Sequence, residues 1–508
     1  MSPIDLAIFI SRVEAVCAEM GAILRRAALS PNIKDRLDFS CALFDQSGEL
    51  FSQAAHIPVH LGSMAFAMSG IVRDVEWQEG DMLVVNDPFL GGTHLPDVTM
   101  IAPMFIGSEL AGFVANRAHH ANIGAESPGS MPLSSNIEDE GLIIPPTLFI
   151  RGGQIVSDVF GSLTAGLETE TGGDVAAQVS ANQAGLQRLK ELVKQVGLDR
   201  FHDGIAATNA YGERLGRAAL NDIPAGVYEF QDVMDDDGFG ATDIPLQISI
   251  HVGEQVTVDF EGTSPQVKGN INCPLSVAAA AVYYVFRCLM PDSTPNCAGT
   301  YRLIEVFAPE GCLVNAQRPA ATAAGNVETS MRIVDLVLGA LSQALPERIP
   351  AASQGTMNNL AMGHHSPSAR WDYYETMGGG IGASPDCDGI SASQSHMTNT
   401  LNTPIESLER HYPLRVIEYG IRKHSGGAGQ YIGGDGIVRE FEFLGEAEVT
   451  ILSERRSGEP WGLNGGEAGK SGFQTLDGAL LPGKVNVTVS KGQRLRLESP
   501  GGGGFGIG

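Results

Sequence analysis

The fold is decided by the stretch DMLVVNDPFLGGTHLPDVTMIAPMFIGSELAGFVANRAHH, residues 81–120. Its beginning, 81–86, is an apolar run that predicts a buried strand. Residues 98–106 and 110–118 predict two further strands, which are joined by the turn IGSE. Together these patterns predict a sheet with a polar, glycine-containing loop at one end of its strands.

Further elements extend from this stretch in both directions. Towards the N-terminus, helical periodicity covers 5–29, with Ser2 as N-cap and Pro3 at the first helical position, and 38–51 predicts a strand pair. The elements predicted after the stretch are helices over 182–196 and 202–221, an antiparallel sheet from about 223, helices over 275–289 and 328–344, and glycine-rich short strands from 351. The predicted fold class is mixed α+β, with antiparallel or mixed sheets and packed helices.

The chain has 508 residues, which is enough for about three domains of ~150 residues each. We expect an N-terminal α/β domain over 1–222 and a middle domain of sheet plus helices over 223–350. A glycine-rich, mostly β domain is expected over 351–508. No internal repeat or low-complexity linker marks the boundaries, so the division rests on the change of element type alone.

The composition excludes several classes of function. With 33 Lys and Arg against 59 Asp and Glu, the net charge is −26, which repels nucleic-acid phosphates and anionic lipid surfaces. No apolar run approaches the ~18 residues of a membrane span, and the N-terminus lacks the basic region of a signal peptide. The seven cysteines are scattered without a CxxC pair, which indicates reduced thiols and a cytoplasmic location.

Three glycine-rich segments imitate phosphate-binding loops and fail on inspection. NGGEAGKSG has Asn464 where a Walker loop needs glycine, and GGGIGA at 378–383 is followed by Pro385, which blocks a helix. The GxGxxG match at 501–506 ends two residues before the chain does. We interpret all three as turns. With no nucleotide site in this sequence, any ATP that the reaction uses must be bound by another subunit.

The best candidates for chemistry are imidazoles and carboxylates in and around the deciding stretch. His94 and Asp97 are three residues apart in a tight loop, so both side chains can point at one divalent cation. His119 and His120 follow at a strand end, where neighbouring side chains face opposite ways, so only one of them can join. Asp38 opens another strand and could add a second carboxylate.

Other interpretations of these histidines stay open from the spacing alone. His94 could simply cap a loop, and the histidine pair could be ordinary interior residues. His56 and His60, spaced i, i+4, are rival ligands, or they line a wall or an interface. Three further histidines carry less weight because no carboxylate stands at a ligand-like spacing beside them: His364, His365 and His396.

Polar neighbours of the loop are candidates for supporting or substrate-contacting roles. Asn86 and Asp87 could orient the imidazoles from outside the ligand set. His120, Asn122 and Glu126 could reach a substrate, although Asn122 and Glu126 serve equally well as hydrogen-bonding loop residues. No catalytic acid, base or nucleophile is identified by the sequence.

Three charged features have a structural interpretation. The acidic run Asp235–Gly238 lacks the spacing of a calcium loop and predicts a solvated hairpin. Glu328 is expected at the start of a helix, where acidic groups complement the helix dipole. Arg455 and Arg456 could meet an anion, but a surface ion pair is the simpler interpretation.

Long motifs in a fixed order resemble the hydantoinase B/oxoprolinase family. The N-terminal half carries RLDFSCALFD, HIPVHLGSM, NDPFLGGTHLPDVTM, NRAHHANIG and EGLIIPP. The later parts carry VDFEGTSPQVKGNIN, AAGNVETSMRI, YYETMGGGIGA, TNTLNTPIESLERHYPLRV, SGGAGQYIGGDG and SPGGGGFG. The resemblance spans nearly the whole chain, and motifs of this length and order are highly specific.

This resemblance implies a metal-carrying B subunit, which works with an A subunit that binds ATP and Mg. Carried over residue by residue, it implies ligands at His94, Asp97 and His119, with Asp38 as the fourth. Asp35 lies close to Asp38 in sequence and could be mistaken for that ligand. The divalent metal, whether Zn, Mn or Fe, would activate water or polarise a carbonyl, and its ligands would lie in the domain over 1–222.

The family comprises ATP-dependent hydantoinases, oxoprolinases and lactamases, together with the related acetone and acetophenone carboxylases. The resemblance therefore implies opening of a cyclic amide or imide in a hetero-oligomer such as A2B2. A subunit of a ketone carboxylase is the alternative, and a non-catalytic scaffold is the third hypothesis. The intact histidine and aspartate motifs argue against the scaffold.

Overall fold

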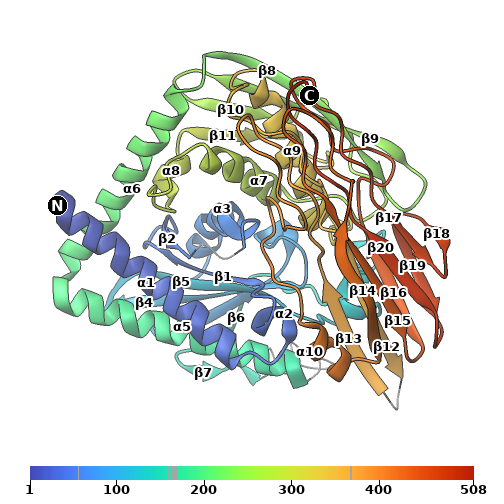
Figure 1. Ribbon diagram of the computed structural model, residues 1–508. Helices are drawn as coiled ribbons and strands as arrows, with labels where there is room; N and C mark the ends of the chain where they lie inside the picture. The colour runs from blue at the N-terminus through green and yellow to red at the C-terminus, as the bar shows by residue number, and fades with distance from the viewer. Residues whose placement is uncertain (55–56, 158–160, 162–168, 367–368) are drawn as a thin grey trace.

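A computed structural model gives the structure of the chain and describes residues 1–54, 57–157, 161, 169–366 and 369–508. Within these residues it has a mixed α and β architecture with four sheets, three of them antiparallel throughout (Figure 1). The α+β prediction is confirmed. No helix in the described ranges is long and apolar enough to cross a membrane.

The first sheet contains the deciding stretch. Its strand order is β2-β1-β5-β4-β3-β6-β7. The strands are β1 (Phe39–Phe44), β2 (Leu50–Gln53), β3 (Met82–Val85), β4 (Asp97–Ile106), β5 (Glu109–His119), β6 (Thr147–Arg151) and β7 (Gln154–Ile155). The strand pair and the three strands expected from the sequence are all present. Long β4 and β5 lie at the centre of the sheet, and the start of β4 pairs with the end of β5.

Helices cover both faces of this sheet. On one face, α1 (Pro3–Ala27) packs against α5 (Thr169–Val196), and their apolar side chains share a core with Val98, Met100 and Val114. On the other face, α3 (His60–Arg73) buries Met64 and Met68 against the sheet. The N-cap of α1 is Ser2, whose hydroxyl accepts a hydrogen bond from the Asp5 N–H, as the sequence predicts.

The second sheet and its helices form the largest apolar core. Its order is β11-β10-β9-β8, and only β10 and β11 pair in parallel. Its strands are β8 (Gly226–Asp236), β9 (Thr242–Val252), β10 (Val256–Asp259) and β11 (Ile304–Phe307). The helices of this part of the chain are α6 (Leu198–Asn221), α7 (Leu275–Cys288), α8 (Ala298–Tyr301) and α9 (Ser330–Ser342), with a π-turn at Gly325–Thr329 before α9. Since α7 contacts both α3 and α9, it joins this core to the first sheet.

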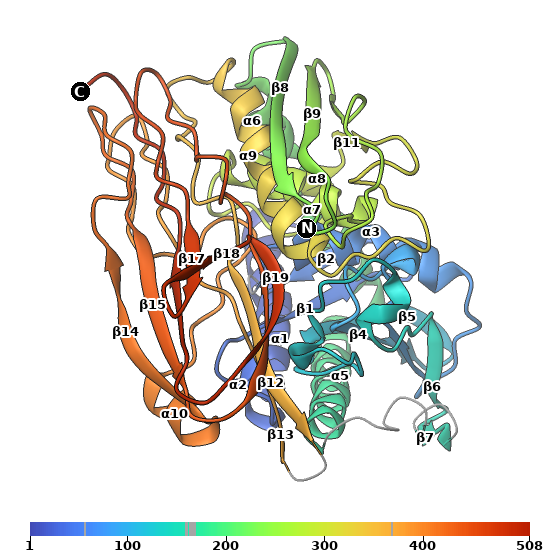
Figure 2. The same cartoon turned by 90° about the vertical axis from the view of Figure 1, so that its right-hand side faces the viewer.

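Two further sheets form a layer at one side of the molecule (Figure 2). One has the order β13-β12-β16-β19 and the other β14-β15-β20-β17-β18, and their facing side chains share one core. The strands are β12 (Asn359–Ser366), β13 (Ala369–Glu375), β14 (Leu414–Arg422), β15 (Gly436–Phe443), β16 (Ala447–Leu452), β17 (Phe473–Leu476), β18 (Ala479–Leu481), β19 (Lys484–Val489) and β20 (Arg494–Glu498). The remaining helices are α2 (Pro31–Lys34) and α10 (Ile405–His411), and short 3-10 turns lie at Pro88–Leu90, Pro128–Ser130 and Ile137–Glu140.

The glycine-rich segments only partly follow the prediction of turns. Asn464 lies in a turn closed by the Gly466 N–H and the Leu463 carbonyl. The segments 378–383 and 501–506 instead lie beside each other and beside Gly434, joined by backbone hydrogen bonds. A Cβ on Gly380 would lie 1.9 Å from the Gly434 carbonyl oxygen, so glycine is needed there for close backbone packing and not for a turn.

Two expectations about charge are corrected by burial. The acidic run does lie where β8 turns into β9, but Asp235 and Asp237 are buried and not solvated. Asp235 accepts hydrogen bonds from the backbone of Arg456 and Ser457, so it ties the hairpin to the C-terminal layer. Arg455 forms an ion pair as expected, with Asp335 and Asp232, but at a buried position and not on the surface.

Candidate metal centre

The loop before β4 is folded tightly enough to aim its side chains inward. A Cβ on Gly92 would lie 2.1 Å from the Asn86 carbonyl oxygen, so only glycine fits there. The Asn86 side chain donates to the Leu95 and Leu142 carbonyls and accepts from the Ile144 N–H. The loop is thereby fixed immediately beside His94.

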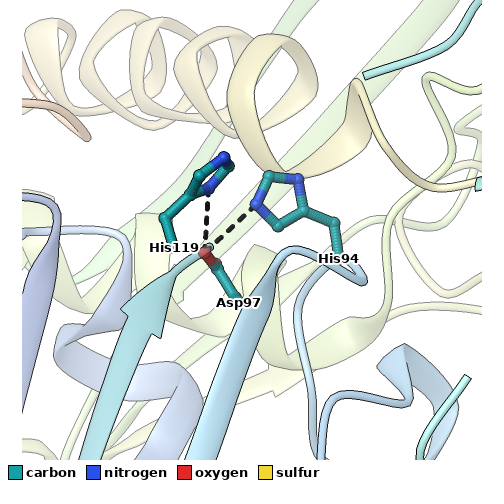
Figure 3. Close-up of side chains that lie close together, drawn as sticks. All are labelled: His94, Asp97 and His119. Atoms are coloured by element: carbon teal, nitrogen blue, oxygen red, sulfur yellow. Dashed lines mark hydrogen bonds and ion pairs between the residues drawn. The ribbon is translucent and has the colours of Figure 1, made fainter. Parts of the chain in front are cut away.

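Strand pairing brings two more side chains to the same place. Asp97 is the first residue of β4 and lies directly opposite His119, the last residue of β5. Asp97 Oδ1 lies 3.2 Å from His94 Nε2 and 3.2 Å from His119 Nδ1 (Figure 3). The three residues are 1–2% exposed, so they form a buried cluster.

The geometry of this cluster suits a divalent cation. Four ligands placed 2.0–2.1 Å from a tetrahedral metal lie roughly 3.3 Å from one another, close to the two 3.2 Å separations found here. The cluster opens on a cavity of about 20 Å³, which has room for one ion or one water molecule. Two imidazoles and a carboxylate suit borderline cations such as Zn, Mn or Fe.

The hydrogen bonds of His94 leave one nitrogen available to a metal. Its Nδ1 lies 3.1 Å from the Ala323 carbonyl oxygen, which can only accept, so Nδ1 carries the proton. Its Nε2 is buried and has no hydrogen-bond partner among the described residues. A buried lone pair without a partner is costly, and a bound cation would satisfy it. Within the described part of the chain the His119 Nε2 is likewise without a partner.

In the cluster, burial and the neighbouring charges shift the pKa of each group in opposite directions. Burial alone would raise the pKa of Asp97, but His94, His60 and His119 together hold the pKa well below its ordinary value. For His94, burial is outweighed by the Asp97 carboxylate and the pKa is raised, whereas burial prevails at His119 and lowers its pKa. Asp97 is therefore an anion and His119 favours the neutral form that can act as a ligand.

Asp38 and His60 also line the cavity of the cluster. Asp38 is 8% exposed and lines the same cavity as the three clustered residues. His60, one of the rival ligands, contacts Asp97 Oδ2 through Nε2 at 3.3 Å. His56, the other histidine of the i, i+4 pair, lies outside the described residues.

The other predicted site residues lie away from the cluster. Asp87 caps the turn at Pro88–Leu90 and pairs with Arg318, so it orients no imidazole. His120 faces α5 and contacts Gln178 Oε1 at 2.8 Å. Asn122 donates to Asp372, and Glu126 is exposed beside a separate surface cavity.

Asn86 supports the site through hydrogen bonds to backbone groups and not, within the described part of the chain, through contact with an imidazole. Its side chain is engaged by the Leu95 and Leu142 carbonyls and by the Ile144 N–H, and not by an imidazole of the described residues. Of the histidines given less weight, His365 pairs with Asp372 and His396 lies 3.9 Å from Asp335. These residues do not line the cavity of the cluster.

Three residues of the site were missed by sequence reasoning. Thr93 donates to Asp97 Oδ2 at 2.6 Å, and Asn326 donates to the same oxygen at 3.3 Å. The Tyr374 ring stacks on His119 with centroids 4.9 Å apart and planes at 14°. Thr93 adjoins the His94 and Asp97 motif and could have been considered, but Asn326 and Tyr374 come from distant segments, and their spacing gave no signal.

Two buried carboxyls support the site from outside the cavity. Glu140 accepts from the backbone N–H of Ala323, whose carbonyl holds His94. Glu328 accepts from Asn359, whose amide oxygen accepts from the Tyr374 hydroxyl beside His119. Burial raises the pKa of each carboxyl to about 7. The cluster is thus supported by segments from the middle and C-terminal parts of the chain.

Comparison with known proteins identifies the family. Residues 2–507 match the family model described as hydantoinase B/oxoprolinase. The chain belongs to this family. The match covers the cluster, its loop and all four sheets, so the family resemblance expected from the motifs is confirmed.

The curated relatives of this hydantoinase B/oxoprolinase chain differ in length. The chain is 40% identical to 5-oxoprolinase 1 of Arabidopsis thaliana, of which it covers 42%. It is 31% identical to the B subunit of a putative D-/L-hydantoinase from a Pseudomonas species, of which it covers 90%. It therefore spans less than half of the oxoprolinase and nearly the whole of the hydantoinase subunit.

Two solved structures share its architecture over the whole chain. The ATP-dependent caprolactamase from Pseudomonas jessenii superposes with a TM-score of 0.92 at 29% identity, covering 91% of that chain. An acetone carboxylase superposes with a TM-score of 0.89 at 18% identity, covering 76% of that chain. The second likeness is one of fold alone.

Proposed function

We propose that this chain is the metal-carrying B subunit of an ATP-dependent amidohydrolase that opens a cyclic amide or imide ring. Hydantoin, 5-oxoproline and lactams are the substrate class. ATP and Mg are held by an A-type subunit, in a hetero-oligomer such as A2B2. The membership of the family, the likeness to a caprolactamase and the likeness to the B subunit of a hydantoinase support this assignment.

The observation that carries the proposal is the buried cluster of His94, Asp97 and His119. Structural packing alone does not require two imidazole nitrogens to lie 3.2 Å from one carboxylate oxygen beside a small cavity. Asp38 lines the same cavity and is the proposed fourth ligand. A divalent cation held there supplies Lewis acidity, which activates water or polarises a carbonyl group.

Backbone and side-chain groups around the cluster then orient the proposed ligands and exclude water. The carbonyl of Ala323 fixes the tautomer of His94, so its Nε2 faces the cavity as a lone-pair donor. Tyr374 stacks on His119 and restricts the rotation of that imidazole. Apolar side chains on the cavity wall, such as Met357 and Met397, exclude bulk water and strengthen the electrostatic interactions inside.

The resonance of an amide explains why ATP is needed. Transfer of a phosphoryl group from ATP to the amide oxygen removes that resonance. Water can then add to the ring carbon, the C–N bond breaks as the ring nitrogen takes up a proton, and hydrolysis of the resulting acyl phosphate gives the ring-opened acid and phosphate. A cavity of about 20 Å³ is smaller than such a ring. Side chains of the cavity wall must therefore move apart when the substrate binds.

The test uses the chain purified in complex with its A-type subunit. We expect ATP-dependent opening of at least one ring in a panel of hydantoin, 5-oxoproline and lactams, measured as ring-opened acid and ADP. Ketones with bicarbonate form the second arm of the panel. Carboxylation of a ketone without opening of any ring would favour the carboxylase alternative and exclude the proposed reaction.

A further inference from the structure

The two carboxylate oxygens of Asp97 have different surroundings. Oδ1 faces the two imidazoles of His94 and His119, at 3.2 Å each. Oδ2 faces three donors: Thr93 Oγ1 at 2.6 Å, His60 Nε2 at 3.3 Å and Asn326 Nδ2 at 3.3 Å. All of these groups are buried. Oδ1 therefore faces the two imidazoles of the proposed ligands, whereas Oδ2 faces three groups that are not proposed as ligands.

The chemistry of the three groups makes them donors and not competitors for a metal. An ionised carboxylate only accepts, so the Thr93 hydroxyl must donate and the NH2 of Asn326 must face Oδ2. For the same reason His60 must carry its proton on Nε2. Its Nδ1 lies 3.0 Å from Ser40 Oγ, which itself accepts from the Ile57 N–H. Both nitrogens of His60 are therefore engaged.

His60 differs in this respect from His94. The Nδ1 of His94 donates to a carbonyl, and its Nε2 lies 3.2 Å from Asp97 Oδ1 without a hydrogen bond within the described residues, whereas the Nε2 of His60 is a donor to Asp97 Oδ2. We propose that His60, Thr93 and Asn326 are positioning residues that engage Asp97 Oδ2, so that Asp97 meets the metal through Oδ1 alone. This inference rests on the proposed metal centre.

Binding of the metal through one oxygen of Asp97 would keep a coordination position open. If both oxygens of Asp97 bound, they would occupy two coordination positions where one is needed. Catalytic metal sites keep a position open for water or substrate. The three donors protect that position, because Oδ2 could turn towards the metal only by leaving their hydrogen bonds.

The experiment uses Co²⁺ as the probe on the full-length chain. Its visible absorption reports coordination number, and titration gives the Kd, so both readouts are independent of turnover. The variants are Thr93→Val and His60→Leu, which remove a donor at similar volume, and His60→Gln, which keeps an NH donor. Thr208→Val removes a buried hydroxyl in α6, far along the chain, and serves as the matched control.

We expect Thr93→Val and His60→Leu to weaken Co²⁺ binding by roughly 10- to 100-fold, the usual effect of losing a ligand's supporting hydrogen bond. The spectrum should shift to the weaker bands of higher coordination. His60→Gln should restore most of the affinity and the spectrum, and the control should match the wild type. Thermal unfolding checks that each variant is folded.

Three results would overturn the inference. Wild-type affinity and spectrum in Thr93→Val would show that the hydroxyl does not position Asp97. Loss of Co²⁺ in His60→Gln as complete as in His94→Ala would make His60 a ligand. Absence of Co²⁺ binding by the wild-type chain would contradict the proposed metal centre as well. If the chain binds Co²⁺ as expected but its complex opens no ring, only the proposed reaction fails.

Discussion

His119 and His120 are adjacent in sequence, yet their imidazoles lie on opposite sides of the first sheet. His119 faces Asp97 in the cavity, and His120 contacts Gln178 on α5. β5 ends at His119, and the alternation of strand side chains to opposite faces continues into His120, whose N–H donates to the Pro96 carbonyl. The pair therefore offers a matched comparison within one motif.

We expect His119→Ala to lose bound metal and His120→Ala to retain it. The first substitution removes a proposed ligand, whereas the second removes only a buried hydrogen bond, which costs about 1–3 kcal/mol of stability. Elemental analysis of the purified chains measures metal per chain, and thermal unfolding measures stability. Equal metal content in the two variants would exclude His119 from the centre.

His94→Ala tests the loop side of the centre. Because His94 supplies a nitrogen whose tautomer is fixed by a backbone carbonyl, its loss should abolish both bound metal and ATP-dependent turnover. The measurements are elemental analysis and the ring-opening assay of the complex. Full activity in a metal-free His94→Ala complex would contradict the site assignment.

Gly92→Ala tests the tight packing beneath the centre. The new methyl group would lie 2.1 Å from the Asn86 carbonyl oxygen, so the loop must shift and carry His94 with it. We expect a loss of about 1–3 kcal/mol of stability together with weaker metal binding.

The matched control for that variant is Gly70→Ala, in α3. Apart from its chain neighbours and the backbone of its own helix, no atom of the described residues lies within 4 Å of its added Cβ. Replacing a helical glycine by alanine should stabilise the chain by about 0.5–1 kcal/mol and leave the metal unchanged. Denaturant unfolding and metal analysis measure both effects, and equal behaviour of the two variants would contradict the packing argument.

The buried carboxyl of Glu328 should make stability depend on pH. Burial raises its pKa from 4.5 to about 7 in the folded state. Between these values the unfolded chain releases the proton while the folded chain keeps it, so stability falls as pH rises and stays low above the window. The loss attributable to this group is up to about 3 kcal/mol.

Glu328→Gln should remove that contribution. We expect the free energy of unfolding of the wild type, compared with the variant, to be lower at about pH 8 than at about pH 5. Glu305→Gln, at an exposed position of β11, is the control and should leave the pH dependence of the wild type unchanged. Parallel stability curves for the wild type and Glu328→Gln would disprove the raised pKa.

Local patterns were sufficient for the elements and for part of the site. Apolar runs and turn signals located β3, β4 and β5, and the i, i+3 spacing of His94 and Asp97 indicated a common target. The alternation of a strand also predicted that only one histidine of the pair could join them. Each of these inferences depends on residues close together in sequence.

Local patterns did not indicate that the charged side chains of Asp235 and Arg455 are buried. Asp235 and Arg455 were expected at the surface because charged side chains usually lie there. In the structure they are buried, Asp235 against backbone N–H groups and Arg455 against Asp232 and Asp335, both far along the chain. Only the packing of the C-terminal layer on the middle of the chain provides these partners.

The sequence by itself determined the α+β class, the order of the main elements and the residue types of the cluster at His94, Asp97 and His119. The tertiary structure alone decided that Asn326 and Tyr374 meet this cluster and that His60 donates to Asp97 Oδ2. The physical reason is range: periodicity and spacing act over a few residues, whereas these contacts depend on how separate sheets and helices pack together.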